Sequence, residues 1–185
     1  MSALTLERQP HRARLGLKGP RAAQWLAANG IDSPATPNTW TNPAPADAAE
    51  TLLVARLGSA EFFLEEAASG TTLKRIAPPL EQHPPGVYPV LRDDWGFVLG
   101  GEGVHDVLAQ VCNVNFAALS LDSRPLIMTL MIGVAVLVVP QRAGEERRYR
   151  IWCDPTFGPY LDASLGGVVI ECGGRYTGAT VTVTQ

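Results

Sequence analysis

A glycine-rich stretch, Gly100-Gly101-Glu102-Gly103, is the first place in this sequence where residue types and spacing suggest chemistry. Glycines before a helix let backbone N–H groups approach a phosphate closely. The stretch does not match G-x-G-x-x-G, the βαβ pattern of a dinucleotide site is missing, and Glu102 would repel an anion. We therefore interpret it as a plain turn, with phosphate binding as the alternative.

The spacing of the histidines and cysteines gives no support to a metal site. No histidine has a cysteine or carboxylate at ligand spacing, so solvated histidines are expected, with His105 on the polar side of its helix. The odd number of cysteines, with no close pair, argues against a disulfide framework and favours buried thiols in a reducing cytosol. The residues concerned are His11, His83, His105, Cys112, Cys153 and Cys172.

Carboxylates and serines give no catalytic pattern either. Asp93-Asp94 is the one adjacent aspartate pair, and neighbours on a strand point to opposite faces, so we interpret it as a solvated turn before Trp95. No serine has the strand–turn–helix surroundings of a nucleophile, and no cysteine pairs with a histidine. The sequence therefore predicts no catalytic residue, no metal ligand and no cofactor held by this chain alone.

Basic and aromatic residues give the candidates for an interface. Arg142, Arg147, Arg148 and Arg150 form a short basic patch that neighbouring glutamates offset. Its default interpretation is a solvated face, and the alternatives are contact with an acidic partner or with a folate tail. Trp40 lies in a polar, proline-rich stretch, which makes it the tryptophan best placed to anchor an interface.

The end of the chain alternates strictly between threonine and small apolar residues. Ala179, Val181 and Val183 fall on one face of the predicted strand, and Gly173-Gly174 before it forms a hinge. A strand of this kind needs a neighbour for its backbone groups. Two alternatives remain open, an edge strand of this chain and a strand that pairs with a partner subunit.

Two stretches, residues 17–27 and 99–109, read as one motif written twice: a strand, a glycine turn and a short helix. A repeat of this length indicates a duplicated module rather than a solenoid. We therefore predict an α+β fold made of two related halves with antiparallel sheets. The expected limits are 1–11 for a flexible N-terminal arm, 12–82 and 83–176 for the halves, and 177–185 for the terminal strand.

The stiff sequence His83-Pro84-Pro85-Gly86 is the predicted boundary between the halves. Apolar periodicity predicts a helix over 104–111, and short helices are also predicted over 20–28 and 157–165. Residues 67–73 are left open as helix or loop. Residues 141–148 are predicted to form a charged connection. The predicted strands are 12–17, 38–41, 51–57, 61–65, 87–90, 94–99, 126–131, 134–139, 149–153, 168–172 and 179–184.

Composition narrows the functional classes. The chain has 185 residues and a net charge of −3, and without a basic stripe nucleic-acid binding has no electrostatic support. The charged N-terminus lacks the apolar core of a signal peptide. The longest apolar run, Leu126 to Val139, is shorter than the roughly 20 residues of a membrane span. We expect a cytoplasmic protein.

Three segments resemble one family. Residues 33–39 (SPATPNT) with 57–64 (LGSAEFFL), 97–112 (FVLGGEGVHDVLAQVC) and 149–157 (YRIWCDPTF) are similar to motifs of the γ subunit of heterotetrameric sarcosine oxidase and its relatives in other amine-demethylating complexes. Those subunits share a fold with the glycine-cleavage T-protein, an aminomethyltransferase. The resemblance extends over roughly residues 12–170.

The sequence departs from the T-protein pattern at positions where that pattern has acidic residues. Pro89 stands where relatives often have an aspartate, and residues 128–139 contain no carboxylate where T-protein-like enzymes carry an Asp-Asp motif. An apolar strand neither orients a charged amine nor accepts a proton. The resemblance therefore implies the fold without the catalytic acid.

On this basis we interpret the chain as a non-catalytic γ-type subunit of a sarcosine oxidase-like, amine-demethylating oxidoreductase. It would stabilise the large subunit or channel material around it, in a hetero-oligomer whose partner subunits hold the flavin and tetrahydrofolate. One alternative is a folate-binding subunit of a dimethylamine monooxygenase-like complex that passes formaldehyde to tetrahydrofolate. The other is a stand-alone folate-binding maintenance protein.

Overall fold

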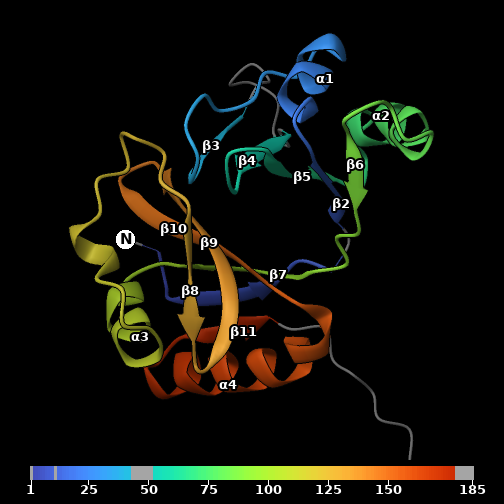
Figure 1. Cartoon of the computed structure of the whole chain (residues 1–185). Helices are drawn as coiled ribbons and strands as arrows, with labels where there is room; N and C mark the ends of the chain where they lie inside the picture. The colour runs from blue at the N-terminus through green and yellow to red at the C-terminus, as the bar shows by residue number, and fades with distance from the viewer. Residues whose placement is uncertain (1, 11, 43–51, 178–185) are drawn as a thin grey trace, which may run out of the picture. The chain divides into compact units, whose positions relative to one another are not determined.

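A computed structural model describes residues 2–10, 12–42 and 52–177 of the chain (Figure 1). The chain divides into two compact units. Unit 1 comprises Met1–Pro10, Asp94–Leu121 and Ile127–Gln185, and unit 2 comprises His11–Asp93 and Asp122–Leu126. Each unit combines one sheet with two α-helices, so the predicted α+β class with two antiparallel-rich sheets is confirmed.

Unit 2 is built on a five-stranded antiparallel sheet in the order β3-β4-β5-β2-β6. Leu17, Phe62 and Leu64 lie on one face of this sheet and are fully buried together with Leu26 and Ile76 of the two helices. The elements are β2 (Arg12–Lys18), α1 (Ala22–Ala28), β3 (Thr39–Thr41), β4 (Leu53–Arg56), β5 (Glu61–Ala67), α2 (Thr72–Glu81) and β6 (Tyr88–Val90).

Unit 1 is built on a six-stranded sheet in the order β11-β1-β7-β10-β9-β8, antiparallel except for the β1–β11 pair. Leu108 of α3 and Leu165 of α4 pack with Leu6, Tyr149 and Ile151 in one core on a single face of the sheet. The elements are β1 (Thr5–Arg8), β7 (Trp95–Gly100), α3 (Val104–Val111), η1 (Phe116–Ala118), β8 (Ile127–Met131), β9 (Val134–Ala143), β10 (Glu146–Cys153), η2 (Pro155–Phe157), α4 (Gly158–Glu171) and β11 (Arg175–Thr177).

The motif that the sequence repeats appears once in each unit, as β2-turn-α1 and β7-turn-α3. Its glycines, Gly19 and Gly101, have φ of +130° and +99°, a backbone region that other residues avoid. A Cβ at Gly19 would lie 2.4 Å from the carbonyl oxygen of Gly86, and one at Gly101 would lie 2.2 Å from that of Ala3. In both units, therefore, another segment crosses the turn so closely that only glycine fits.

The expected flexible arm at the N-terminus is wrong, because residues 5–8 form β1 inside the sheet of unit 1. β1 pairs with β7 on one side and with β11 on the other. Leu4 and Leu6 are buried in the core. Four residues are too few to show clear periodicity, so these long-range pairings were not visible in the sequence.

The division between the units also differs from the predicted one. It falls between Asp93 and Asp94 rather than at His83–Gly86, and residues 122–126 return to unit 2. The proline-rich stretch before His83 belongs to helix α2, which contains Pro78 and Pro79. The buried carboxylate of Glu66 accepts hydrogen bonds from the N–H groups of Thr72 (3.2 Å) and Leu73 (2.9 Å) and so caps this helix at its start.

Two further elements depart from expectation in unit 1. Residues 168–172, predicted as a strand for their β-branched content, continue α4, and residues 141–148 are the ends of β9 and β10 rather than a loose connection. The predicted helix over 104–111 is confirmed at both ends. Among the helices of the described ranges, none has the length and apolar character that crossing a membrane requires.

Candidate functional site

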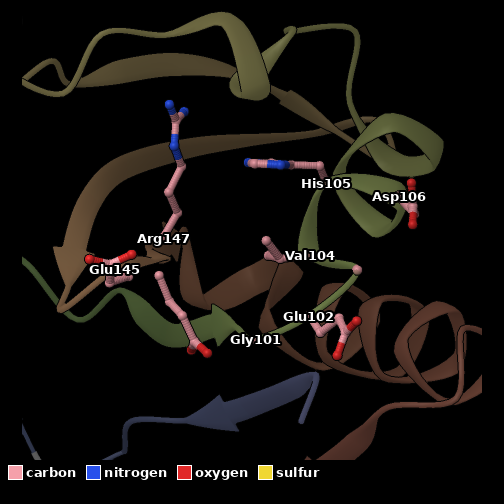
Figure 2. Close-up of a pocket in the computed structure, with 9 residues that line it drawn as sticks. Gly101, Glu102, Val104, His105, Asp106, Glu145 and Arg147 are labelled. Atoms are coloured by element: carbon pink, nitrogen blue, oxygen red, sulfur yellow. The ribbon is translucent and has the colours of Figure 1, made fainter. Parts of the chain in front are cut away.

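A pocket of about 460 Å³ opens beside the start of α3 in unit 1 (Figure 2). One wall is the turn after β7 and the first residues of α3, and the other is the tip of the β9–β10 hairpin. The lining residues are Gly101, Glu102, Gly103, Val104, His105, Asp106, Glu145, Glu146 and Arg147.

His105 and Tyr149 form the central polar contact of this region. The Nε2 atom of His105 lies 2.7 Å from the Tyr149 hydroxyl oxygen, and Tyr149 is fully buried, edge-on to the ring of Phe116. Burial raises the pKa of Tyr149, although Arg147 partly opposes this. The tyrosine hydroxyl is therefore protonated near neutral pH and shares a hydrogen bond with the histidine, whose tautomer decides which of the two donates.

Arg147 influences the same histidine. Figure 2 shows the Arg147 side chain and the His105 ring reaching into the same space from facing elements, whereas Asp106 points away. Burial, followed by the charge of Arg147, lowers the pKa of His105, and Asp106 partly offsets the decrease. His105 is thus held as a neutral imidazole that is hydrogen-bonded to Tyr149. The guanidinium of Arg147 donates to the carbonyl oxygen of Phe116 at 2.8 Å.

The acidic side chains of the pocket make it a poor place for an anion. Glu102, Asp106 and Glu145 are exposed at its mouth. Glu146 accepts hydrogen bonds from the backbone N–H and the hydroxyl of Ser2, and these bonds lower the pKa of its carboxyl group. Four carboxylates around one arginine and one neutral histidine would repel a phosphate or the carboxylates of a folate tail.

Part of the backbone of the glycine turn is also already paired. The N–H of Glu102 donates to Ser2, that of Val104 to Gly101, and that of Asp106 to Gly103, at 3.0, 3.3 and 3.0 Å. A phosphate cradle depends on such N–H groups being available to the ligand. These pairings favour the interpretation as a turn over phosphate binding.

A second hollow, of about 500 Å³, lies on the other side of His105, between α3 and η1. Its walls combine polar and apolar surface in similar amounts. Asn115, its most distinctive polar residue, uses its side-chain oxygen to cap η1 through the N–H of Ala118, 3.3 Å away. The thiol of Cys112 lies 3.8 Å from the hydroxyl of Thr129. The lining residues are His105, Leu108, Ala109, Cys112, Asn113, Val114, Asn115, Phe116 and Ala117.

The described part of the chain offers no obvious metal or nucleophile site. It contains no group of three or more histidine, cysteine, aspartate or glutamate side chains placed to hold a metal. Burial, and then the charges of Asp94, Asp154 and Asp162, raise the pKa of the Cys153 thiol to about 12. This thiol is therefore protonated and unreactive at neutral pH.

The predicted basic patch is divided between the two faces of β10. Arg147 is half-buried on the side of Tyr149, and Arg148 is exposed on the opposite side, because neighbours on a strand alternate. Arg150 shares the second side and lies over the ring of Trp152, 5.2 Å from its centroid. Of the two arginine candidates, Arg148 alone is exposed.

The tryptophan candidate for an interface is tied into unit 2. Trp40 is half-buried in β3, its backbone N–H donates to the carbonyl oxygen of Arg124 at 3.1 Å, and the Arg124 guanidinium lies 5.6 Å from its ring centroid. The sequence did not reveal this contact, because Arg124 is distant along the chain. The other candidates, Ala179, Val181 and Val183, lie outside the described residues.

The pair of His105 and Tyr149 was missed by sequence reasoning, which placed His105 as a solvated residue. The two residues are 44 positions apart, and the strand alternation of Tyr149, Ile151 and Cys153 signals only a buried face. Nothing in the spacing indicates which helix covers that face.

No protein-family model and no curated protein matches this chain. Solved structures that share its fold include the following two. The aminomethyltransferase T of the glycine cleavage system from Bartonella henselae superposes with a TM-score of 0.71 at 14% identity, over 96% of this chain and 48% of that one. A chain of the heterotetrameric sarcosine oxidase from Corynebacterium sp. U-96, in complex with pyrrole 2-carboxylate, superposes with a TM-score of 0.69 at 22% identity, over 95% of this chain and 88% of that one.

These likenesses define the class of fold, that of the T-protein or folate-binding proteins. This chain spans about half the length of the aminomethyltransferase. Identity is low in both comparisons, so the activity, substrates and partners of the matched proteins do not carry over to this chain by similarity alone.

Proposed function

We propose that this chain is a γ-type, non-catalytic subunit of a multisubunit oxidoreductase that demethylates amines, with sarcosine or a similar N-methyl amine as substrate. The flavin and the tetrahydrofolate would be held by larger partner subunits. This chain would stabilise those subunits or help to channel intermediates between their sites.

The observation that carries the proposal is the unequal coverage of the two similar structures. The chain accounts for 88% of a chain from a heterotetrameric oxidase but for only 48% of the aminomethyltransferase. The fold of this chain therefore matches most of one chain of a multisubunit oxidase and about half of the enzyme. The likeness to a member of such an assembly supports the proposal of a subunit role.

The chemistry of unit 1 supports a non-catalytic role. The β8–β9 hairpin between Met128 and Val139 has no carboxylate, which is where the T-protein resemblance requires one. The available histidine, His105, is already bonded to a buried tyrosine. A general base has to reach the proton that it removes. The imidazole of His105 is instead hydrogen-bonded to Tyr149, which belongs to the core.

Purification of the tagged full-length chain from cells that naturally make it tests the proposal. We expect a larger flavin-containing protein to co-purify, and the complex to oxidise sarcosine or dimethylamine and to transfer the one-carbon unit to tetrahydrofolate. The isolated chain should show no turnover. Turnover by the chain freed of partners, or purification without any flavoprotein, would contradict the proposal.

A further inference from the structure

The sheets of the two units have four edges, and three of them carry a feature that discourages pairing with another chain. β6 contains Pro89, which lacks a donor, β11 begins with the exposed cation Arg175, and β3 is bridged at Thr39 by Pro125. Natural sheets protect exposed edges with such prolines, charges or covering segments. Within the described residues, these three edges are therefore guarded.

The fourth edge, β8, has no such feature in the part of the chain that the structure describes. Its sequence, Ile127-Met128-Thr129-Leu130-Met131, contains no charge and no proline, and its register with β9 runs without a bulge. A bridge to Cys112 covers Met131 alone. Residues 127–130 thus form an apolar edge of the kind that pairs with a further strand.

The side chains beside this edge are also unusually apolar for a surface. Met128 and Leu130 are 56% and 61% exposed. They lie opposite Leu137 and Ala135 of β9, on the face of the sheet turned away from the core of unit 1. Single exposed apolar residues are ordinary, but an apolar patch continuous with an open edge marks an interaction surface.

We propose that β8 is the docking strand for a partner subunit, whose extended segment adds to the sheet and whose body covers Met128 and Leu130. The segment that fits has apolar side chains at alternate positions, because alternate residues of an added strand face the patch. This inference rests on the proposed function for the identity of the partner, a different chain of the assembly.

A second copy of this chain fits less well. Two copies of β8 that paired antiparallel about a twofold axis would present the same face on the same side of the joined sheet. The exposed side chains of both copies would then form a larger open patch rather than a buried one. A partner of different structure satisfies the backbone edge and covers the side chains at once.

A photo-cross-linking residue at position 130 of the tagged full-length chain tests the surface directly. The same residue at position 170 is the control, because Ile170 is 59% exposed but lies on α4. We expect position 130, and not position 170, to cross-link to a larger chain, at a segment with alternating apolar residues. A cross-linked product of two copies of this chain, or equal results at the two positions, would overturn the proposal.

Charged substitutions give an independent measurement. Leu130→Lys should reduce the co-purified partner at least about tenfold without a change in melting temperature, because the lysine adds a charge to a surface that becomes buried. Ile170→Lys should retain the partner. Retention of the partner by Leu130→Lys would overturn this surface. A cross-linked partner that contains no flavin would instead contradict the proposed function while leaving the surface in place.

Discussion

His105 connects the chemistry of the pocket with the stability of the fold. It lies on the wall of both hollows and shares a hydrogen bond with a tyrosine that is fully buried. Its neutral form suits this position, because burial and Arg147 both oppose a positive charge. Protonation of this one side chain therefore has a cost that the unfolded chain does not have.

The expected result is a loss of stability in mild acid. Below a pH of about 6.5 the unfolded chain binds a proton at this histidine that the folded chain resists, so the free energy of unfolding falls as the pH drops through 6.5 towards the lowered pKa. Above 6.5 the contribution is fully present. Urea titrations between about pH 5 and 8 measure this slope.

His105→Gln should flatten that slope, because glutamine accepts the hydrogen bond of Tyr149 without titrating. His83→Gln is the matched control, since His83 is exposed at the end of α2, and it should leave the slope in place. An unchanged slope in the His105 variant would show that other groups cause the pH dependence.

Among the elements, α3 was predicted over its full length and α4 only in its first part, residues 158–165. The residues Val104, Val107, Leu108 and Val111 recur at helical spacing, and all four are buried. In α4 the run Val168-Val169-Ile170 has strand propensity, but the packing of Leu161, Leu165 and Val169 on the sheet outweighs that preference. The local sequence pattern predicts the type of an element correctly where it agrees with tertiary packing, and incorrectly where it does not.

Leu108→Ala tests the face that α3 presents to the core. Leu108 is 1% exposed, and removing its side chain should lower the free energy of unfolding by about 2–5 kcal/mol through lost burial and a cavity. Gln110→Ala, an exposed position on the same helix, should change it by less than about 0.5 kcal/mol. Equal unfolding midpoints for both variants would mean that the helix is turned the other way.

For the candidate site, the sequence predicted the individual segments but not how they are arranged in space. It located the glycine turn, the basic patch and the apolar run over residues 126–139, since each is continuous along the chain. It did not reveal that Arg147 and Arg148 separate to opposite faces, nor that His105 meets Tyr149, because these depend on which elements are neighbours in the sheet. Strand order is set by long-range pairing that periodicity does not encode.

The order of the chain through its two units explains why the predicted boundary was wrong. β1 and β7 are antiparallel neighbours, with Leu6 opposite Leu99 and Arg8 opposite Phe97, and the N–H of Gln9 donates to Gly96 at 2.8 Å. Residues 11–93 of unit 2 are thus inserted where unit 1 would otherwise have a hairpin turn. A composition change such as that at His83–Gly86 does not mark an insertion of this kind.

This arrangement predicts opposite outcomes for two truncated chains. Residues 94–185 alone should fail to fold, because they lack β1, which pairs with both β7 and β11 and carries the buried Leu4 and Leu6. Residues 1–10 joined to 94–185 by a short Gly-Ser linker should fold cooperatively, because the linker only has to close a β1–β7 hairpin. Circular dichroism and urea unfolding of both chains provide the comparison. If the shorter chain unfolds as cooperatively as the linked one, β1 is dispensable; if neither folds, unit 1 depends on residues 11–93 and its independence is wrong.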